Sequence, residues 1–422
     1  MTFSGLIVQL LNGLAGASSL FLVGAGLSLI FGVTRIVNFA HGSFYMLGIY
    51  IAYMLAEQLG GGMWFWPSLL LASIAVGVIG AVVEIVLLRR VYRAPELFQL
   101  LATFALMLVI KDAALWVWGP EDLLGPRAPG LSGAVDILGR RFPTYDLFLI
   151  AVGPLVLGGL WLLLTKTRWG TLVRAATQDR EMVSALGVNQ AWLFTGVFAL
   201  GTMLAGLGGA LQLPREPANL GLDLATIGDA FVVVVVGGMG SIPGAYVAAL
   251  LIAEIKAICI GIGTVDLFGV GFAFSKLTLV VEFLVMAVVL VIRPWGLMGK
   301  PQAAVRNSAP AETPLRRADT PLKIAGAVLL IALIAWPVAT ASSPYLTVLA
   351  IDLLTAALFA TSLHFIMGPA GMHSFGHAAY FGLGAYGAAL GVRSFGLPME
   401  VALVLSPFVA AIGALVFGWF CV

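Results

Sequence analysis

The stretch VNFAHGSFYMLGIY, residues 37–50, places a histidine inside a run that is apolar enough to lie in a lipid bilayer. A second stretch, HSFGHAAYFGLGAY, residues 373–386, repeats this pattern far downstream. An offset of 336 positions places His377 on His41, and it also aligns Gly32 with Gly368, Phe39 with Phe375, Leu47 with Leu383, Gly48 with Gly384 and Tyr50 with Tyr386. The chain therefore contains one apolar element twice.

The composition is that of an integral membrane protein. Hydrophobic residues make up 61% of the chain and charged residues 10%, and the mean hydropathy is +1.05, values far from those of soluble domains. Apolar runs of about the 20 residues that cross a hydrocarbon core as helix lie near 5–31, 39–56, 67–88, 97–118, 147–164, 192–213, 227–260, 277–292, 322–338, 346–367, 375–392 and 401–420. They lack the alternation that a membrane β-barrel requires, so we expect an all-α polytopic helical bundle.

The remaining bulk properties exclude several classes. A net charge of +2 is too small to indicate a nucleic-acid partner. Cys259 and Cys421 are the two cysteines, and they predict no disulfide framework. The first apolar run follows no basic segment and is too long for a cleavable signal, so we interpret it as the first membrane span.

The distribution of basic residues predicts the orientation. They gather in three segments, which contain Arg89, Arg90 and Arg93; Lys166, Arg168, Arg174 and Arg180; and Lys300, Arg306, Arg316, Arg317 and Lys323. Positive residues beside membrane spans favour the cytoplasmic side. We therefore place these segments in the cytoplasm, and the N-terminus and segment 119–146 outside.

Residues 299–321 contain four prolines and no apolar run, which predicts a flexible or extended cytoplasmic linker rich in proline and arginine. This linker divides the chain into residues 1–298 and residues 322–422. Counting spans gives both copies of the repeat the same direction across the membrane. We therefore expect two parallel homologous halves, the second incomplete, with a pathway between them.

Span counting does not settle the structure of residues 231–245. Gly221 is expected outside and Pro294 inside, so an odd number of crossings is needed between them. The glycines at 237, 238, 240 and 244 and Pro243 interrupt a helix. Two interpretations stay open. The segment is either a discontinuous element that lines the pathway or a turn outside the membrane.

The repeated element predicts a common helical face. If residues 38–55 are helical, His41, Tyr45 and Gly48 share one face. This face could serve close helix packing, with the histidines bonded to backbone carbonyls, or it could contact the solute, since ionisable residues at membrane depth mark pathways. The candidates for either role are Asn38, His41, Tyr45, Gly48, Gly237, Gly238, Gly240, Pro243, Ser374, His377, Phe381 and Gly384.

Two further sets of polar residues need an interpretation. His373 and His377 are spaced to share a metal ion, but no carboxylate or cysteine accompanies them and no HExxH motif occurs, so we expect no metal site. Charges within the apolar runs more plausibly neutralise one another than relay protons. We expect Lys111 to pair with Asp112 and Glu254 to pair with Lys256. We expect Glu84 and Glu282 to have no charged partner.

The segment TRWGTLVRAATQDREMVSALGVNQ, residues 167–190, lies between two spans on the basic side. Residues 171–186 contain no glycine or proline, and Gly187 follows as a helix stop. Their apolar face consists of Leu172, Ala175, Ala176, Met182, Val183 and Leu186. We expect one short amphipathic helix that either docks on a partner or lies on the lipid surface.

A family resemblance favours the docking partner. RAATQDREMVSALGVN, residues 174–189, resembles the cytoplasmic coupling-helix motif of ABC importer permeases of the branched-chain amino-acid type. GLSLIFGVTRIVNFAHGSFYMLG, residues 26–48, and GGMGSIPGA, residues 237–245, resemble signature stretches of LivH-type permeases, and the resemblance covers essentially all of residues 1–298. It implies that an ATPase subunit docks on Arg174, Asp179, Ala185, Gly187 and Asn189.

Residues 322–422 resemble the start of the companion LivM-type permease. The pattern is carried by Gly368, Gly371, Ser374, Gly376 and His377, whereas Met372 replaces a glutamine of the family and His373 is atypical. The resemblance implies two homologous permease subunits fused end to end. A second coupling helix would fall beyond Val422, so we expect a second permease chain, or the missing remainder of the LivM-like half, as a partner.

The resemblance implies the transmembrane permease of an ABC importer for branched-chain or other hydrophobic amino acids, in a bacterial inner membrane. The chain contains no GxxxxGK[ST] loop for nucleotide phosphates. We therefore expect no catalysis and no cofactor on this chain, with ATP-Mg bound by cytoplasmic ABC ATPase subunits. A periplasmic or extracellular solute-binding protein and membrane lipid are the further partners.

Other functions remain open at this stage. Related permeases carry urea or short amides. An ion-coupled secondary transporter would need an intramembrane carboxylate or histidine that titrates, and a passive channel or scaffold would have no use for a coupling helix. An intramembrane enzyme is disfavoured, since neither HExxH nor GxSxG occurs.

Overall fold

The computed structural model describes residues 3–92, 94–267, 270–299, 301, 319–340, 342–368, 374 and 376–421. The chain forms two compact units, residues 1–305 (unit 1) and 306–422 (unit 2). Among the described residues, nine helices are long and apolar enough to cross a membrane. The protein is therefore an all-α polytopic membrane protein, as its composition predicts.

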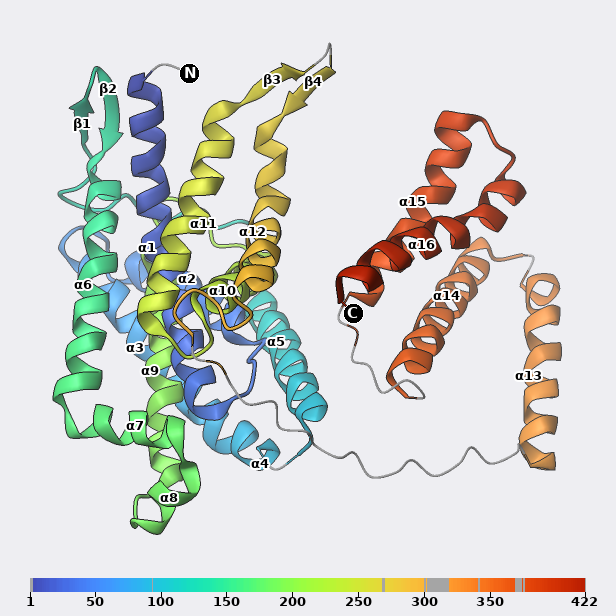
Figure 1. Ribbon diagram of the computed structural model, residues 1–422, viewed down its shortest axis with the longest axis horizontal. Coiled ribbons are helices and arrows are strands. Elements are labelled where there is room, and N and C mark those ends of the chain that lie inside the picture. The colour runs from blue at the N-terminus through green and yellow to red at the C-terminus, as the bar shows by residue number, and fades with distance from the viewer. Residues whose placement is uncertain are drawn as a thin grey trace. The chain divides into compact units, whose positions relative to one another are not determined.

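Unit 1 consists of long helices joined by short helices and two β-hairpins (Figure 1). The long helices are α1 Phe3–Thr34, α2 His41–Gln58, α3 Phe65–Val83, α5 Glu96–Trp118, α6 Thr144–Lys166, α9 Gln190–Ala210, α10 Leu222–Gly237, α11 Ile242–Ile262 and α12 Thr278–Ile292. The short helices are η1 Gly62–Trp64, the π-helix η2 Glu84–Leu88, α4 Arg89–Val91, α7 Arg168–Gln178, α8 Arg180–Ala185 and η3 Phe274–Leu277. The antiparallel hairpins are β1 Ala134–Ile137 with β2 Arg140–Pro143, where Val135 faces Phe142, and β3 Thr264–Leu267 with β4 Val270–Ala273.

The core of unit 1 forms around α1, which packs against α6, α9, α10 and α11. Small residues make this close packing possible, because membrane helices approach through residues that lack bulky side chains. A Cβ on Gly26 would meet the backbone oxygen of Gly201 in α9. Glycine contacts of this kind therefore allow the long apolar helices to pack closely in one bundle.

The two ends of unit 1 differ in character. The basic segments at α4, α7 and α8 lie at one end, whereas the N-terminus and both β-hairpins lie at the other (Figure 1). Segment 119–146 contains β1 and β2 and so lies at the hairpin end. This arrangement agrees with the orientation that the basic residues predict. We call the α7–α8 end the inner end and the hairpin end the outer end.

The apolar run 227–260 forms two helices, α10 and α11, joined by a turn at 238–241. Together with α12 they supply three helices between Gly221 and Pro294, which is the odd number that the orientation requires. Gly238 and Gly240 have φ angles of 101° and 83°, a region that favours glycine.

Unit 2 contains α13 Thr320–Ala339, α14 Pro344–Met367, α15 His377–Phe395 and α16 Met399–Cys421. The offset of 336 places α14 on α1, α15 on α2 and α16 on α3, and it carries the first residue of α2 onto the first residue of α15. The windows that mark α13 and α14 as membrane spans contain no buried residue in this chain. Unit 2 thus repeats the first three helices of unit 1 while leaving most of its apolar surface uncovered.

Candidate functional site

The segment at the inner end forms two helices where the sequence predicts one. The prediction of a single amphipathic helix is wrong, because Asp179 takes an extended backbone and ends α7. Its Oδ1 then accepts a hydrogen bond from Met182 N (3.0 Å) as the N-cap of α8. An aspartate whose side chain competes for backbone N–H groups favours such a cap over a helix interior. We call α7 and α8 together the inner hairpin.

Two further residues of the proposed docking motif shape the backbone. Gly187 has a φ of 82°, and its N–H donates to Ser184 O (2.9 Å) just after α8. Asn189 caps α9, since its Oδ1 accepts from Trp192 N (3.3 Å). The motif residues Asp179, Gly187 and Asn189 therefore stabilise the backbone of the inner hairpin. All three residues are exposed at its surface.

The apolar face of the inner hairpin is divided between two surroundings. Val173, Ala176 and Val183 are buried against the helices of unit 1. Met182 and Leu186 instead point outward, with exposed fractions of 59% and 76%, and Ala185 beside them is exposed. We call Met182, Ala185 and Leu186 the hairpin tip. The sequence assigns Met182, Val183 and Leu186 to one face, but of these three only Val183 is buried against the bundle.

A groove of about 420 Å³ lies where the inner hairpin meets the bundle. It is lined by the end of α1, by α7 and by the start of α11. Arg174, Thr177 and Gln178 are the α7 residues in this lining. A Cβ on Gly32 would lie 3.3 Å from Gly240 Cα and 3.9 Å from Thr177 Cγ2. The hairpin, the end of α1 and the turn at 238–241 are thus in direct contact.

The glycines of this turn serve close backbone contact. A Cβ on Gly237 would meet the backbone of Gly244, and one on Gly238 would meet Gly299. Pro243 lies in the first turn of α11, where a missing N–H breaks no helical hydrogen bond. The backbone of residues 231–245 is therefore that of two helices joined by a tight turn.

The histidine of the repeated element is placed inside the bundle. His41 is fully buried at the start of α2, and its Nε2 lies 3.0 Å from Val23 O of α1. Gly48 lies on α2 where a Cβ would meet the backbone of Gly206 in α9. His41 and Gly48 therefore contact neighbouring helices, which is the geometry expected for packing.

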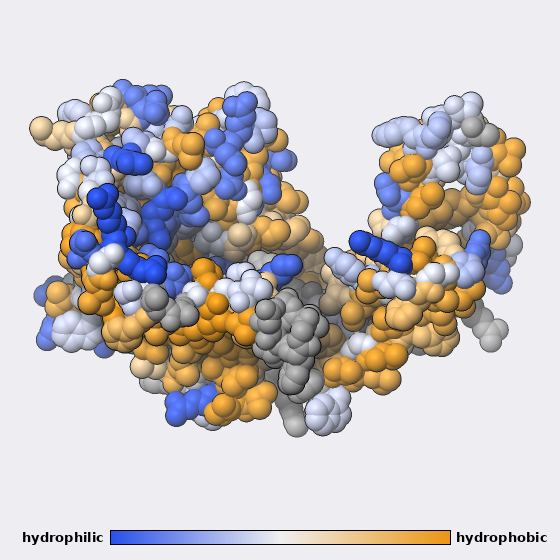
Figure 2. All heavy atoms as spheres, turned by 90° about the horizontal axis from the view of Figure 1, so that it is seen from above, coloured by the Kyte–Doolittle hydropathy of each residue, from blue (hydrophilic) through white to orange (hydrophobic). Residues whose placement is uncertain are grey.

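Tyr45, on the same face, lines a cavity of about 400 Å³ between α1, α2, α10 and the segment after α9. Its hydroxyl donates to Glu216 Oε1 (2.8 Å). Arg215, Glu216 and Asp229 add charged groups to the same wall. Figure 2 looks onto the outer face, where hydrophilic residues gather in the middle of unit 1 and hydrophobic residues border them. We call the cavity that Tyr45 lines the outer cavity.

Sequence reasoning missed Arg215, Glu216 and Asp229. The signal for the first two is the charged pair that directly follows the apolar run ending at 213. Their place is fixed by backbone contacts, since Leu123 and Ala218 exchange hydrogen bonds of 3.0 and 2.9 Å, and Tyr145 Oη donates to Leu211 O (2.7 Å).

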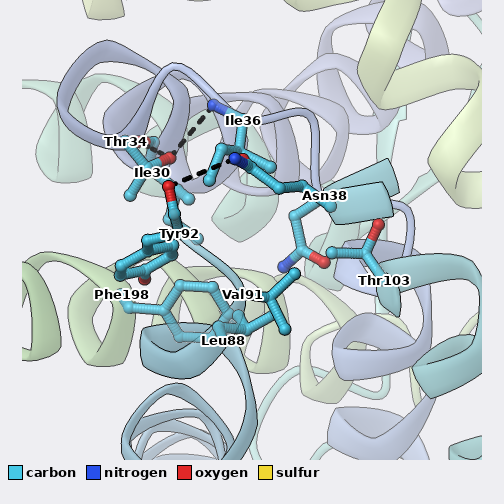
Figure 3. A pocket seen from close by; sticks show the side chains of 10 residues that line it. Ile30, Thr34, Ile36, Asn38, Leu88, Val91, Tyr92, Thr103 and Phe198 are labelled. Atoms are coloured by element: carbon cyan, nitrogen blue, oxygen red, sulfur yellow. Dashed lines mark hydrogen bonds between the residues drawn. The ribbon is translucent and has the colours of Figure 1, made fainter. Parts of the chain in front are cut away.

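Asn38 lies in the loop between α1 and α2, beside a cavity with room for about 10 Å³ (Figure 3). That volume holds about one water molecule. The Oδ1 of Asn38 accepts from Ala40 N (3.1 Å), and Thr34 Oγ1 donates to Ile30 O (2.9 Å) while accepting from Ile36 N (3.3 Å). The side chain of Asn38 therefore shapes the loop that starts α2.

The charged residues within the spans pair differently from the sequence prediction. Lys111 contacts Asp223 (3.6 Å), and Lys256 contacts both Asp229 (3.1 Å) and Glu282 (2.5 Å). The expected pairs Lys111–Asp112 and Glu254–Lys256 are wrong, because residues one or two positions apart do not face each other on a helix. Glu84 and Glu282, expected to stand alone, are also paired, and Glu84 contacts Arg89 (3.2 Å) and Thr195 (2.6 Å).

The corresponding residues of unit 2 lie on α15 or just before it. His377 Nε2 lies 2.7 Å from Ser362 Oγ, and its ring centroid lies 5.2 Å from that of Phe359. Phe381 is 49% exposed, and Gly384 lies beside α16, where a Cβ would be 3.8 Å from Ser406 O. Ser374 is half-buried. Gly371, Met372 and His373 lie outside the described residues.

Comparison with known proteins places this architecture among transport proteins. A family model described as branched-chain amino acid transport system / permease component matches residues 9–290. The chain is 29% identical over 304 residues to the high-affinity branched-chain amino acid transport system permease protein BraD of Pseudomonas aeruginosa, covering 70% of this chain and 96% of the relative. It is 25% identical over 307 residues to LivH of Escherichia coli K12, with the same coverages. It is 28% identical over 297 residues to a probable LivH of Methanocaldococcus jannaschii, covering 66% and 88%. No solved structure matches the chain.

Proposed function

We propose a function from one premise: the chain belongs to the family of permease components of branched-chain amino acid transport systems. It acts as the transmembrane permease of an ABC importer that carries branched-chain or related hydrophobic amino acids. Unit 1 provides the pathway between the outer cavity and the inner groove. The observation that supports coupling is the contact of the inner hairpin with both the end of α1 and the turn at 238–241.

ATP hydrolysis takes place on separate cytoplasmic ATPase subunits that bind ATP-Mg. The hairpin tip offers them an exposed apolar surface, since Met182 and Leu186 are uncovered in this chain. A helical element that is anchored by Val173 and Val183 moves as a body, so a force on the tip shifts α1 and the turn together. Such rigid-body movement is a common means of alternating access. On the outer side, which is the periplasm for a bacterial inner membrane, a solute-binding protein delivers the amino acid.

Unit 2 is the beginning of a LivM-like permease half that is fused through the linker. Two observations support this assignment. The offset of 336 superposes the starts of α2 and α15, and His41 and His377 each contact the preceding long helix at equivalent positions, Val23 and Phe359. The uncovered apolar faces of α13 and α14 suit a further permease segment and lipid.

A second candidate function is an ion-coupled carrier. Glu254 favours it, because both carboxylate oxygens are shielded from solvent and have no hydrogen-bond partner among the described residues. A carboxylate in that setting is costly while ionised. It is the one group in the described spans that this alternative would select for coupling.

Reconstitution distinguishes the two. The full chain, with its ATPase subunits and binding protein, is placed in proteoliposomes, and uptake of radiolabelled leucine and of urea is measured with ATP or with an imposed proton or sodium gradient. We expect leucine uptake that needs ATP and survives dissipation of the gradients. Uptake that follows a gradient without ATP, and that is lost in Glu254→Gln, would instead support the carrier.

A further inference from the structure

The outer cavity contains charged groups of both signs, which a pathway for an uncharged solute would not need. Arg215, Glu216 and Asp229 line it together with the apolar side chains of Leu20 and Val23. Placing charges beside a membrane-embedded cavity is costly unless they meet opposite charge. Asp146 and Lys256 meet part of the charge of Arg215 and Asp229, and the cavity still presents groups of both signs to a ligand with matching groups.

Arg215 retains capacity for an anion. Its Nε contacts Asp146 Oδ1 (3.0 Å), and its Nη1 lies at a long 3.4 Å from Gln212 Oε1. The guanidinium carries five N–H donors in a planar fork, so donors remain after these contacts. A carboxylate is the anion that this fork binds with two parallel hydrogen bonds.

Glu216 and Asp229 retain capacity for a cation. Glu216 accepts one hydrogen bond from Tyr45 through Oε1, and Asp229 contacts Lys256 through Oδ2. These contacts use Glu216 Oε1 and Asp229 Oδ2, so Glu216 Oε2 and Asp229 Oδ1 lie outside them. The side chain of Asp229 is 37% exposed, so a ligand in the cavity can reach it.

We propose that the outer cavity is a binding site for the zwitterionic head of an α-amino acid, with Arg215 holding the carboxylate and Glu216, assisted by Asp229, holding the ammonium group. Leu20 and Val23 of α1 then contact the aliphatic side chain. This inference rests on the proposed function and deepens it, because it assigns amino-acid selectivity to the permease. Urea or a short amide lacks both charges and cannot pair with the guanidinium of Arg215 and the carboxylate of Glu216 at once.

The test measures weak binding to the full chain in nanodiscs by saturation-transfer-difference NMR. The probes are leucine, leucinamide, which lacks the carboxylate, and 4-methylpentanoate, which lacks the ammonium group. We expect leucine to bind the wild-type chain at least about tenfold more tightly than either analogue, the size of one lost charge-assisted hydrogen bond. Arg215→Gln should abolish the preference for leucine over leucinamide, and Glu216→Gln the preference over 4-methylpentanoate.

Matched controls separate ligand binding from architecture. Asp146→Asn removes the ion pair of Arg215 but keeps its guanidinium, and Gly158→Ala adds a methyl group on α6 where a Cβ meets nothing within 4 Å. We expect both controls to bind leucine within about threefold of wild type, less than the tenfold loss of one such hydrogen bond. Equal loss in Asp146→Asn and Arg215→Gln would assign Arg215 a structural role and overturn the inference. Leucine binding that is unchanged in Arg215→Gln, or absent in wild type, would overturn it as well, while ATP-dependent leucine uptake by the wild-type complex would leave the proposed function standing.

Discussion

Ser362 Oγ lies 2.7 Å from His377 Nε2, and this pair occupies the positions that correspond to Gly26 and His41 in unit 1. In unit 1 a Cβ on Gly26 would lie 3.1 Å from the His41 ring. The histidine at the start of the second repeated helix thus faces the same position of the first repeated helix in both units. The two units therefore share this contact between helices as well as the repeated sequence.

Replacing Gly48 tests the packing role of the repeated element. In Gly48→Ala the new methyl group would meet the backbone of Gly206, and neither helix backbone can yield as a flexible side chain would. We expect a loss of about 1–3 kcal/mol in the free energy of unfolding, the usual range for an overpacked core. Thermal unfolding of the purified chain in detergent measures it. Gly158→Ala on α6, where a Cβ meets nothing within 4 Å, is the matched control and should unfold as wild type does.

The fold could be predicted from the sequence to the level of helices and their direction. The apolar runs and the basic segments suffice for that, since length and charge at the ends are local properties. Within the run 227–260 the glycines and Pro243 predicted an interruption, and the structure has a turn at 238–241 where Gly238 and Gly240 take positive φ angles.

The candidate site was less accessible to sequence reasoning. Asp179 divides the inner hairpin through a capping bond that a pattern of apolar residues does not reveal. The ion pairs of Lys111 and Lys256 join different helices, so spacing along one helix could not find them. Tyr45 is a candidate from the sequence, whereas Glu216, its hydrogen-bond partner, is 171 positions away and could not be linked to it by spacing.

Replacing Asp179 tests whether the shape of the inner hairpin couples ATP hydrolysis to transport. Asp179→Ala removes the N-cap of α8, which stabilises a helix by about 1 kcal/mol, while the exposed position leaves the membrane bundle untouched. We expect ATP hydrolysis without matching leucine uptake in proteoliposomes, with normal insertion. Asp179→Asn preserves a capping oxygen and should couple as wild type does; equal uncoupling in both variants would show that the charge, not the cap, matters.

Gly187→Ala should also uncouple ATP hydrolysis from leucine uptake, because the φ of 82° at this position strains alanine.

Lys256 joins α10, α11 and α12 through its contacts with Asp229 and Glu282. Lys256→Met leaves two carboxylates facing each other without the ammonium group, an arrangement that is strongly destabilising inside a protein. We expect a lower melting temperature than in wild type. Adding Glu282→Gln removes one of the two charges and should restore part of the loss, and a double variant no more stable than Lys256→Met would contradict the assigned network.

The central claim is that the hairpin tip receives the ATPase. Its most direct measurement is photo-crosslinking from p-benzoylphenylalanine at position 186, where Leu186 is 76% exposed, in membranes that contain the whole transporter. The control places the same group at Leu124, which is 77% exposed and lies in the outer segment 119–146. We predict a crosslink to the ATPase subunit from position 186 and none from position 124. A crosslink from position 186 to an outer binding protein, or to lipid alone, would contradict the account.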